Sequence, residues 1–329
     1  MFDVVTVGTA TRDIYIEKLN FPIVKVKEKG FVTRRGICIP YDSKTEVPRI
    51  SFGWGGSGAN TAVTFRRMGF KVGLISRVGD DIYGREIQAS FKKQKVKTFI
   101  QIDKQYSTPI GVILLDVSGG RTVLVYRGAE ERFTPKEVPW PKIKTRWLFI
   151  GSIAGRVDLL LKLFNWAKKN KIKIAGNPGK RELQFLKKNL NLLNNYDIFV
   201  CNQNEASILT GEEFFEVRKI FKRLDKLVKG IAVMTRGKDG VMVSDGETLY
   251  KSETFKPKKI ENKTGAGDAF ASGFTAGYIL KNNIEYAIKA GLANACSVVE
   301  TIGSQAGILT KKQLDSPRWK NLSILKVRL

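Results

Sequence analysis

The sequence predicts an α/β fold, in which a central and mainly parallel sheet is flanked by helices and carries a small lid of β-strands. After residue 145, strand-like runs alternate with helix-like runs, which is typical of a parallel sheet covered by helices. Segments within about 12–52 and 105–127 are rich in Val, Ile, Phe and Thr without a helical period, and they predict the lid strands. With 329 residues, 43% of them hydrophobic, the chain suits a single domain over 1–329.

The individual elements follow from hydrophobic periodicity and turn residues. The first part of the chain predicts a buried strand over 2–8, a helix over 60–68 that ends at Gly69, a strand over 71–79, a helix over 82–93, and a lid hairpin over 110–127 with its turn at Gly119-Gly120. The second part predicts strands over 146–152, 171–176, 197–202 and 230–236, helices over 159–170 and 181–193, and a buried helix over 269–280.

The charge and composition limit the partners and the compartment. The net charge of +26 is large, but the lysines are dispersed and form no long block. We interpret them as a solvated surface that attracts an anionic substrate; a nucleic-acid site would gather basic residues on one face. No apolar run approaches the roughly 18 residues of a membrane span, and the N-terminus lacks the pattern of a secretion signal. The three cysteines form no CxxC pair, which favours free thiols in a reduced cytoplasm.

The chain has no histidine, which removes whole classes of catalysis. Nucleophile pairs of the Ser-His and Cys-His type and zinc sites with histidine ligands are excluded. A general base must therefore be Asp, Glu, Lys, Tyr or Cys. Carboxylates beside Gly-rich turns become the candidates of most interest.

The strongest motif is the segment Thr264-Gly265-Ala266-Gly267-Asp268, directly before the apolar helix over 269–280. Two glycines at this spacing let the backbone approach a ligand closely. The free N–H groups and the dipole of a helix N-terminus favour an anion. Asp268 in the first turn is well placed to accept a proton from an attacking hydroxyl. The alternative is an ordinary Gly-rich turn in which Asp268 is a carboxylate that favours the helix start.

A second Gly-rich segment runs over 53–62 and contains the pattern GxGxxG. This pattern would suggest a dinucleotide-binding site. In such sites the pattern directly follows the first strand, but here that strand ends at Gly8 without it, and the pattern occurs later, after irregular β-rich sequence. The alternative is a floor of backbone amides on which Asn60 meets a small polar ligand. A Walker-type phosphate loop, GxxxxGK[ST], is absent from the sequence.

Three further groups follow predicted strands. Asp13 comes after the first strand and could accept hydrogen bonds from two sugar hydroxyls, or lie in solvent. Asn202 and Glu205 could hold Mg²⁺ beside phosphates, or cap a helix. Thr235 and Gly237 open a turn that could line a nucleotide, or simply join two strands.

Taken together, these segments resemble the ribokinase-like (PfkB) carbohydrate kinase family. The order and spacing of the motifs agree with that family over about residues 3–308. The motifs that carry the resemblance are Gly-Gly-x-Gly-Ala-Asn at 55–60, Gly-Asp-Asp-x-x-Gly at 79–84, Asn-x-x-Glu at 202–205, Thr-x-Gly-x-x-Gly at 235–240 and Thr-Gly-Ala-Gly-Asp at 264–268.

The resemblance implies ATP-dependent phosphoryl transfer to a hydroxyl of a small sugar or polyol. Asp268 is expected to be the general base, and the amides of Gly265, Ala266 and Gly267 to form an anion hole. The resemblance also implies contacts to the nucleotide: Asn202 and Glu205 with the phosphates of Mg-ATP, Glu205 with Mg²⁺ through water, Thr235 and Gly237 along the nucleotide, and Asn294 near its base. Around the acceptor it implies Asp13, Gly55, Gly56 and Asn60. Transfer of this kind relies on positioning and charge stabilisation.

The chain departs from the family pattern in three places. Asn262 and Lys263 stand where many members have Asp and Thr before the last motif, and that Asp often helps to bind a monovalent cation, so dependence on K⁺ is undecided. Residues 151–155 lack the acidic residue with which ribokinases contact the sugar. Residues 25–50 are longer or more irregular than a minimal lid.

The acceptor therefore stays open between a sugar, a nucleoside and a sugar phosphate. A nucleoside would favour aromatic residues in the lid, and a sugar phosphate would need a cation facing the pocket. The candidates are Phe21, Phe31, Tyr41 and Phe52 for the first, and Arg12, Arg34 and Arg35 for the second. A non-catalytic sensor is a further alternative. Lids in the family can pair between subunits, which leaves a homodimer open.

Overall fold

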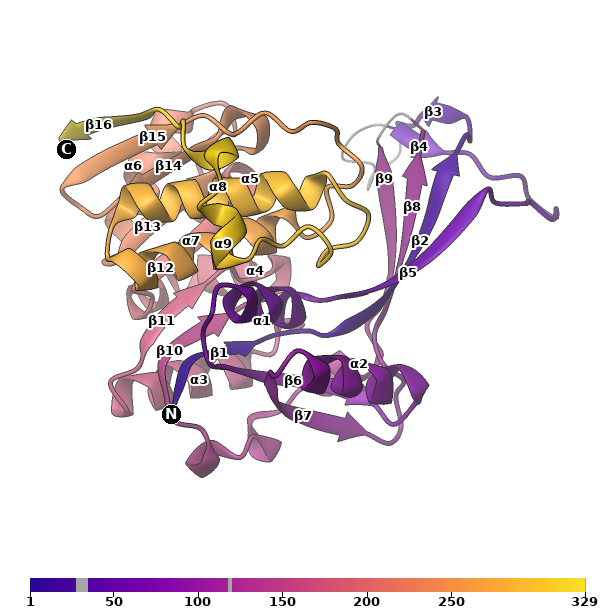
Figure 1. Ribbon diagram of the computed structural model, residues 1–329, viewed down its shortest axis with the longest axis horizontal. Helices are drawn as coiled ribbons and strands as arrows, with labels where there is room; N and C mark the ends of the chain where they lie inside the picture. Colours follow the sequence, from indigo (N-terminus) through magenta and orange to yellow (C-terminus); the bar gives the residue numbers. More distant parts are fainter. Residues whose placement is uncertain (28–34, 118–119, 329) are drawn as a thin grey trace.

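The computed structural model describes residues 1–27, 35–117 and 120–328, so Phe31, Arg34 and Gly119 of the predictions above lie outside the described residues. Within those ranges the main sheet has 10 strands in the order β16-β15-β14-β13-β12-β11-β10-β1-β6-β7 (Figure 1). The strands are β1 (Phe2–Val7), β6 (Val72–Gly79), β7 (Lys97–Asp103), β10 (Thr145–Ile150), β11 (Lys173–Gly176), β12 (Ile198–Asn202), β13 (Ile231–Thr235), β14 (Val241–Ser244), β15 (Thr248–Ser252) and β16 (Ile324–Arg328). The run from β13 to β7 is parallel, and β14 to β16 are antiparallel, which confirms a mainly parallel sheet.

The lid is a separate four-stranded sheet in the order β5-β2-β8-β9. Its strands are β2 (Thr11–Leu19), β5 (Arg49–Gly55), β8 (Ile110–Asp116) and β9 (Arg121–Tyr126). The short strands β3 (Ile23–Lys25) and β4 (Arg35–Ile37) form a two-stranded ribbon beside it. Figure 1 shows the lid projecting from one end of the molecule, away from the helices that cover the main sheet.

Helices cover both faces of the main sheet and bury two hydrophobic cores. One core packs Val4, Leu74 and Val233 against α1 (Ser57–Arg67), α2 (Ile82–Lys93), α7 (Ala266–Lys281) and α8 (Ile284–Val299). The other packs Val5 and Ile75 against α3 (Val157–Lys169), α4 (Lys180–Lys188), α5 (Gln203–Thr210) and α6 (Val217–Leu227). Consecutive residues of one strand thus face different cores, which explains why these strands are apolar without alternation.

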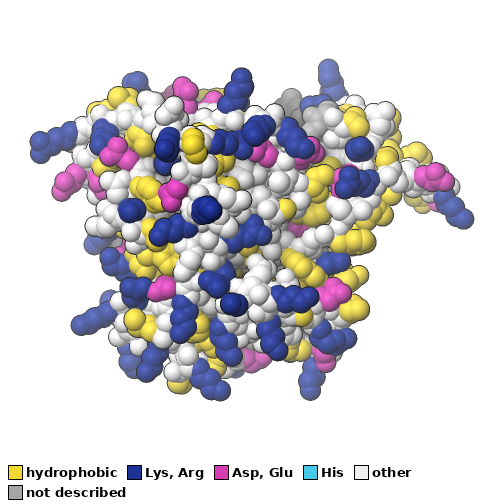
Figure 2. All heavy atoms as spheres, viewed as in Figure 1, with side chains coloured by type: hydrophobic (Ala, Val, Ile, Leu, Met, Phe, Trp, Pro, Cys, Tyr) yellow, Lys and Arg dark blue, Asp and Glu magenta, His cyan; other side chains and the backbone are white. Residues whose placement is uncertain are grey.

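Short elements complete the described chain. They are α9 (Lys311–Leu314) and the 3₁₀ helices at Gly128–Arg132, Pro135–Glu137, Trp140–Lys142, Leu190–Asn195, Gly237–Asp239 and Pro317–Trp319. No helix in the described ranges is both long and apolar enough to cross a membrane. Lys and Arg side chains are spread over the whole visible face rather than gathered in one patch (Figure 2).

Most differences from the predicted elements concern helix ends. α2 has the predicted bounds, and Asp81 caps it by accepting a hydrogen bond of 2.8 Å from the Gly84 N–H. α1 begins earlier than predicted, at Ser57, because Gly56 has a φ of 93° that turns the chain sharply into the helix. The predicted helix over 181–193 is wrong in its second half: α4 ends at Lys188, since Asn189 leaves helical geometry and the chain continues as a 3₁₀ helix.

Candidate active site

The site is centred on the first turn of α7, where Asp268 lies. Gly265 precedes the helix with a φ of 83°, and a Cβ there would lie 2.6 Å from the Ser304 Cβ, so this position requires glycine. The first N–H groups of a helix have no partner within it. The Ala266 N–H donates a long hydrogen bond of 3.4 Å to the Lys263 carbonyl oxygen, which leaves the amides of Gly265 and Gly267 most available to an anion beside Asp268.

Asp268 is partly buried and held by one side chain. Its Oδ2 accepts a hydrogen bond of 2.9 Å from Asn60 Nδ2, which comes from α1. Burial raises the pKa of Asp268 to about 6, and the hydrogen bond from Asn60 opposes this shift. A carboxylate with such a pKa is deprotonated at neutral pH and is a better proton acceptor than an exposed one.

Asp13 lies in the lid strand β2, buried to 6% exposure. Its carboxylate accepts hydrogen bonds from Thr11 Oγ1 at 2.9 Å and from the Tyr15 hydroxyl at 3.1 Å. Burial raises the pKa of Asp13 to about 6, and the nearby charge of Asp268 raises it further. A Cβ on Gly55 would lie 2.1 Å from Asp13 Oδ2, so the glycine makes room for the carboxylate.

The loop after α8 joins the two carboxylates through Ser304. The Ser304 Oγ–H lies 3.0 Å from Asn60 Oδ1, and the Ser304 N–H donates to the Tyr15 hydroxyl oxygen at 3.3 Å. Gln305 Nε2 also donates to Asn60 Oδ1, at 3.2 Å. Sequence reasoning missed this loop, because no motif in the sequence marks Ser304 or Gln305 as neighbours of Asp268.

A cavity of about 210 Å³ opens beside Asp268. It is lined by Arg121, Asn177, Val200, Asn202, Glu205, Thr235, Lys263, Gly265, Gly267 and Asp268. The structure thus brings six of the predicted site residues around one hollow: Asn202, Glu205, Thr235, Gly265, Gly267 and Asp268. Arg121 and Lys263 are cations at this cavity, and Arg121 was not singled out in the sequence analysis.

Asn202 and Glu205 form a capping box at the start of α5. Asn202 Oδ1 accepts from the Glu205 N–H at 2.9 Å, and Glu205 Oε2 accepts from the Asn202 N–H at 2.8 Å. The helix-capping alternative is therefore realised, and the same side chains line the cavity. Burial raises the pKa of Glu205, with a smaller contribution from the charge of Asp268.

The oxygen ligands around this cavity fit Mg²⁺, which prefers carboxylates, waters and phosphates. Glu205 and Asp268 both line it. No cluster of three or more acidic, Cys or His side chains that could hold a metal occurs in the described ranges. A metal here would be shared between Glu205 and the phosphates of a bound nucleotide, as Mg²⁺ sites of this kind commonly are.

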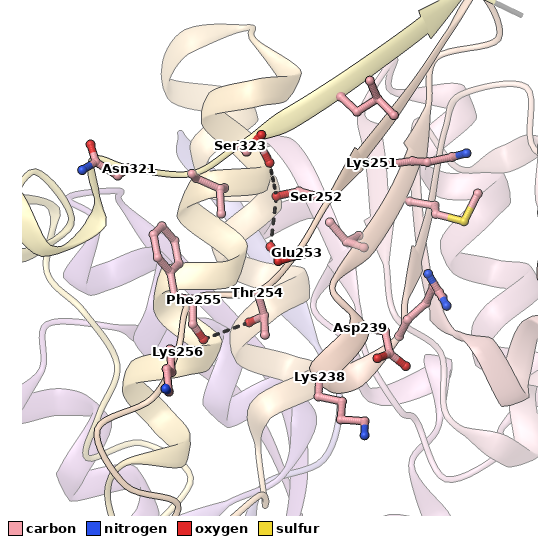
Figure 3. Close-up of a pocket in the computed structure, with 15 residues that line it drawn as sticks. Lys238, Asp239, Lys251, Ser252, Glu253, Thr254, Phe255, Lys256, Asn321 and Ser323 are labelled. Carbon is pink, nitrogen blue, oxygen red and sulfur yellow. Dashed lines mark hydrogen bonds between the residues drawn. The ribbon is translucent and has the colours of Figure 1, made fainter.

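A larger groove of about 980 Å³ is lined by residues of β14 and β15 and by the segment before β16 (Figure 3). Lys238 and Asp239 from the β13–β14 turn border it, and the segment around Phe255 faces them. Ser252 closes one end by donating to the Ser323 carbonyl oxygen at 3.0 Å. Thr235 lines the small cavity and Arg236 the groove, so this end of β13 borders both hollows. Gly237 lies in the same turn.

The structure does not place Asn294 in the site. Its side chain is fully buried in α8, with Nδ2 donating to the Ala269 carbonyl oxygen at 2.8 Å and Oδ1 accepting from the Leu309 N–H at 2.9 Å. Both ends of the amide are thus used in holding α8 to α7 and to the chain before α9. The described conformation thus uses Asn294 between α8 and its neighbours, and its place near the nucleotide base stays a prediction.

The chain is similar to known proteins over most of its length. Residues 1–311 match the model described as pfkB family carbohydrate kinase. The deoxyribokinase of Salmonella typhi is 25% identical over 288 residues, covering 84% of this chain and 92% of its own. The cytidine kinase of Thermococcus kodakarensis is 28% identical over 252 residues, covering 76% and 88%. The structure of the nucleoside kinase of Methanocaldococcus jannaschii superposes with a TM-score of 0.77 at 22% identity, covering 97% and 98%.

Proposed function

Because the chain belongs to the pfkB family of carbohydrate kinases, we propose that it transfers the γ-phosphoryl group of ATP to a hydroxyl of a small sugar or polyol, with Asp268 as general base. Family membership makes it an ATP-dependent kinase of sugars or nucleosides and confirms the resemblance found in the sequence. The observation that carries the finer proposal is the position of Asp268 in the first turn of α7, in one cavity with Gly265 and Gly267 and close enough to Asp13 for its charge to raise the pKa of that carboxyl.

The proposed reaction begins with the acceptor hydroxyl held between the lid and α7. Asp13 accepts hydrogen bonds from hydroxyls of the acceptor, and Asp268 takes the proton of the attacking one. The acceptor oxygen forms a bond to the γ-phosphorus as the bond from that phosphorus to the bridging oxygen breaks, and ADP leaves. The amides of Gly265, Ala266 and Gly267 stabilise the charge on the transferring group. Bound Mg²⁺ would neutralise phosphate charge, and Glu205 would orient it through water.

The lid favours a sugar over a nucleoside as the acceptor. Phe52 pairs with Ile14, whereas Asp13 pairs with Gly53, so Phe52 lies on the outer face of the lid and Asp13 on the inner face. Tyr41 is 91% exposed. The predicted aromatic platform for a nucleobase is therefore not formed by these two side chains.

Arg12, one of the three cations considered for a sugar phosphate, does not share the face of the lid that carries Asp13. Arg12 shares the outer face with Phe52, and its guanidinium stacks 4.3 Å from the ring of Trp54. It also lies 3.8 Å from the carboxylate of Glu86. Arg12 is thus engaged away from the proposed acceptor position.

The experiment that tests this function is ADP release from Mg-ATP across a panel of acceptors. The panel should contain ribose, deoxyribose, polyols, cytidine, adenosine and ribose 5-phosphate. We expect turnover with an uncharged sugar or polyol. Turnover with nucleosides alone would show that the acceptor is a nucleoside rather than a sugar or polyol. Binding of Mg-ATP without any turnover would favour a non-catalytic sensor.

We also propose that the reaction does not need K⁺. Asn262 is 3% exposed, and its Oδ1 accepts from the Thr264 N–H at 2.8 Å, while its Nδ2 is buried without a hydrogen-bond partner. An N–H donor at this position repels a cation that a carboxylate would attract. We expect equal rates in Na⁺ and K⁺ buffers, measured by ADP release, with Asn262→Asp as the comparison variant. Strong activation of the unmodified chain by K⁺ would contradict this reading of Asn262.

The outer face of the lid supports a homodimer as the working form. Ile50, Phe52, Leu124 and Tyr126 are 48%, 61%, 56% and 47% exposed and share this face. Figure 2 shows hydrophobic side chains gathered at the end of the molecule that holds the lid. A contiguous apolar face of this kind marks an interaction surface.

Free thiols at all three cysteines are consistent with the reduced cytoplasm proposed for the enzyme.

We expect light scattering to give the mass of two chains for the unmodified protein and of one chain for Leu124→Glu, because a buried charge would disrupt a lid-to-lid contact. Leu161→Glu is the matched control, since Leu161 is 37% exposed on α3, outside the lid. A monomeric unmodified protein, or an equal effect of both variants, would contradict the proposed dimer.

A further inference from the structure

Arg12 lies where the lid joins the part of the molecule that holds the main sheet. It is the second residue of β2, directly before Asp13, and its N–H donates to the Pro109 carbonyl oxygen at 2.9 Å. Because side chains alternate along a strand, Arg12 points to the outer face of the lid and Asp13 to the inner face. Whatever fixes the backbone at Arg12 therefore also fixes the point from which Asp13 projects.

Aromatic rings from two parts of the fold surround the guanidinium of Arg12. Its Cζ lies 4.3 Å from the ring centroid of Trp54 and 5.0 Å from that of Phe52, both on lid strand β5. The ring of Tyr83, in the first turn of α2, is 5.5 Å away. A cation within about 6 Å of an aromatic ring face is attracted to it. Arg12 thus connects the lid with a helix that covers the main sheet.

A carboxylate of the same helix adds an ion pair to this contact. Glu86 Oε2 lies 3.8 Å from Arg12 Nη1, and the Arg12 side chain is only 15% exposed. Glu86 and Tyr83 are three residues apart, so they lie on one face of α2. The Nε atom of Arg12 is buried and has no hydrogen-bond partner among the described residues. The guanidinium is therefore a buried, oriented group and not one of the solvated charges of the surface.

The start of α2 also holds a second strand of the lid. Asp81, which caps this helix, accepts hydrogen bonds of 2.7 Å from the N–H and from the Oγ1–H of Thr108, two residues before β8. The Gly79 N–H donates to Thr108 Oγ1 at 3.0 Å. Since β8 and β2 are neighbours in the lid sheet, the first turn of α2 anchors both strands, and Arg12 makes its contact with β2.

Resting on the proposed function, we propose that Arg12 is a positioning residue for the acceptor, because it fastens the base of the lid to α2 and so holds Asp13 in place opposite Asp268. Arg12 touches neither the acceptor nor ATP. It acts through Asp13, by fixing the backbone of β2 and by its charge. A misplacement of about 1 Å at a reacting group can cost about 100-fold in rate, so the anchoring of this strand affects turnover.

The charge of Arg12 acts on the same carboxyl group. Burial raises the pKa of Asp13 to about 6, against hydrogen bonds from Thr11 and Tyr15 that lower it. The charge of Asp268, from α7, raises this pKa further, whereas the charge of Arg12 lowers it. Loss of the positive charge therefore raises the pKa of Asp13, so that its carboxylate is protonated at a higher pH. The acid limb of kcat/KM should then lie at a higher pH as well.

The test measures ADP release from Mg-ATP with the acceptor that the panel identifies. Arg12→Met keeps the length of the side chain without its charge, and Arg12→Lys keeps the charge. We expect Arg12→Met to raise the acceptor KM about 10- to 100-fold, with a much smaller change in kcat and unchanged affinity for Mg-ADP in calorimetry. Its acid limb should move to higher pH, whereas that of Arg12→Lys should stay close to the limb of the unmodified protein.

The helix side of the joint supplies an independent variant. Tyr83→Leu should also raise the acceptor KM, and combining it with Arg12→Met should add little, because both changes release the same contact. Arg85→Met is the matched control, since Arg85 lies on the same helix with a 65% exposed side chain, 3.1 Å from Asp80. An exposed pair of this kind contributes little, so the control should change neither the acceptor KM nor the pH profile.

Several results would overturn the proposal. An unchanged acceptor KM in Arg12→Met, with normal turnover by the unmodified protein, would show that the joint does not position Asp13. Equal losses in kcat, acceptor KM and Mg-ADP affinity, without a shift of the acid limb, would show a general disturbance of the fold. Full additivity of Arg12→Met and Tyr83→Leu would show two unrelated effects. Absence of turnover by the unmodified protein with every acceptor would overturn the proposed function, and this inference with it.

Discussion

Replacing Asp268 by Asn should lower kcat by about 10²- to 10⁴-fold, the usual contribution of a general base. The amide has nearly the shape of the carboxylate, and its oxygen can keep the hydrogen bond that Asn60 Nδ2 donates at 2.9 Å. It cannot take the proton of the acceptor hydroxyl. Because the cavity walls are unchanged, affinity for Mg-ADP should stay the same. ADP release at saturating acceptor gives kcat, and calorimetry gives the affinity for the nucleotide.

The pH profile provides an independent check on this assignment. Asp13 and Asp268 both have a pKa raised to about 6, mainly by burial. A protonated carboxyl accepts no proton, so kcat/KM should be retained above this pH and fall as the pH is lowered through about 6. Below pH 6, kcat/KM should fall more steeply with two titrating carboxyls than with one. The residual activity of Asp268→Asn should show the shallower decline; an unchanged slope, or a variant as active as the original, would contradict the role of Asp268.

Replacing Gly55 by Ala should strongly weaken acceptor binding while leaving the nucleotide side intact. The new Cβ would lie 2.1 Å from Asp13 Oδ2, a distance that no adjustment of a few tenths of an ångström relieves. The carboxylate must therefore move, and its hydrogen bonds to the acceptor are lost. Two hydrogen bonds to a charged group together correspond to about 100-fold or more in affinity. We expect this increase in the acceptor KM, measured with the acceptor that the panel identifies.

Gly53→Ala is the matched control for this prediction. Gly53 lies on the same strand and the same face, but a Cβ there would meet only the ring of Tyr15, at 3.2 Å. Its effect on the acceptor KM should be much smaller. Equal effects of Gly53→Ala and Gly55→Ala would show that β5 is disturbed as a whole, and an unchanged KM for Gly55→Ala would remove Asp13 from the acceptor site.

The sequence predicted the features that depend on local pattern. The alternation of buried strands and amphipathic helices after residue 145 specified the parallel sheet, because periodicity reflects which faces are buried. The glycines at 265 and 267 before an apolar helix specified the start of α7. Strands β14 to β16 were not predicted: β14 has only four residues, and β15 and the edge strand β16 have few buried ones, so their periodic signal is weak.

The features that depend on distant contacts were out of reach of the sequence. Arg121 is one of 57 Lys and Arg residues, and only the pairing of β9 with β8 turns it toward the cavity. Ser304 comes near Asp268 through the path of the loop after α8. Asn294 was assigned to the nucleotide, but an asparagine between two buried helices is equally suited to bonding the backbone, and that is what its environment selects.

The link between Asn60 and Asp268 spans 208 residues of sequence, and this separation affects how the enzyme is made. Synthesis proceeds from the N-terminus, so the lid, Asn60 and the segment around Glu205 leave the ribosome before α7 does. β1 must also wait for β10, its parallel neighbour, which is more than a hundred residues away by the register Phe2 to Thr145. A nascent chain thus contains Asp13, Asn60 and Glu205 before it contains Gly265, Gly267 and Asp268. The arrangement around Asp268 can therefore form only after α7 has been made and has docked against α1.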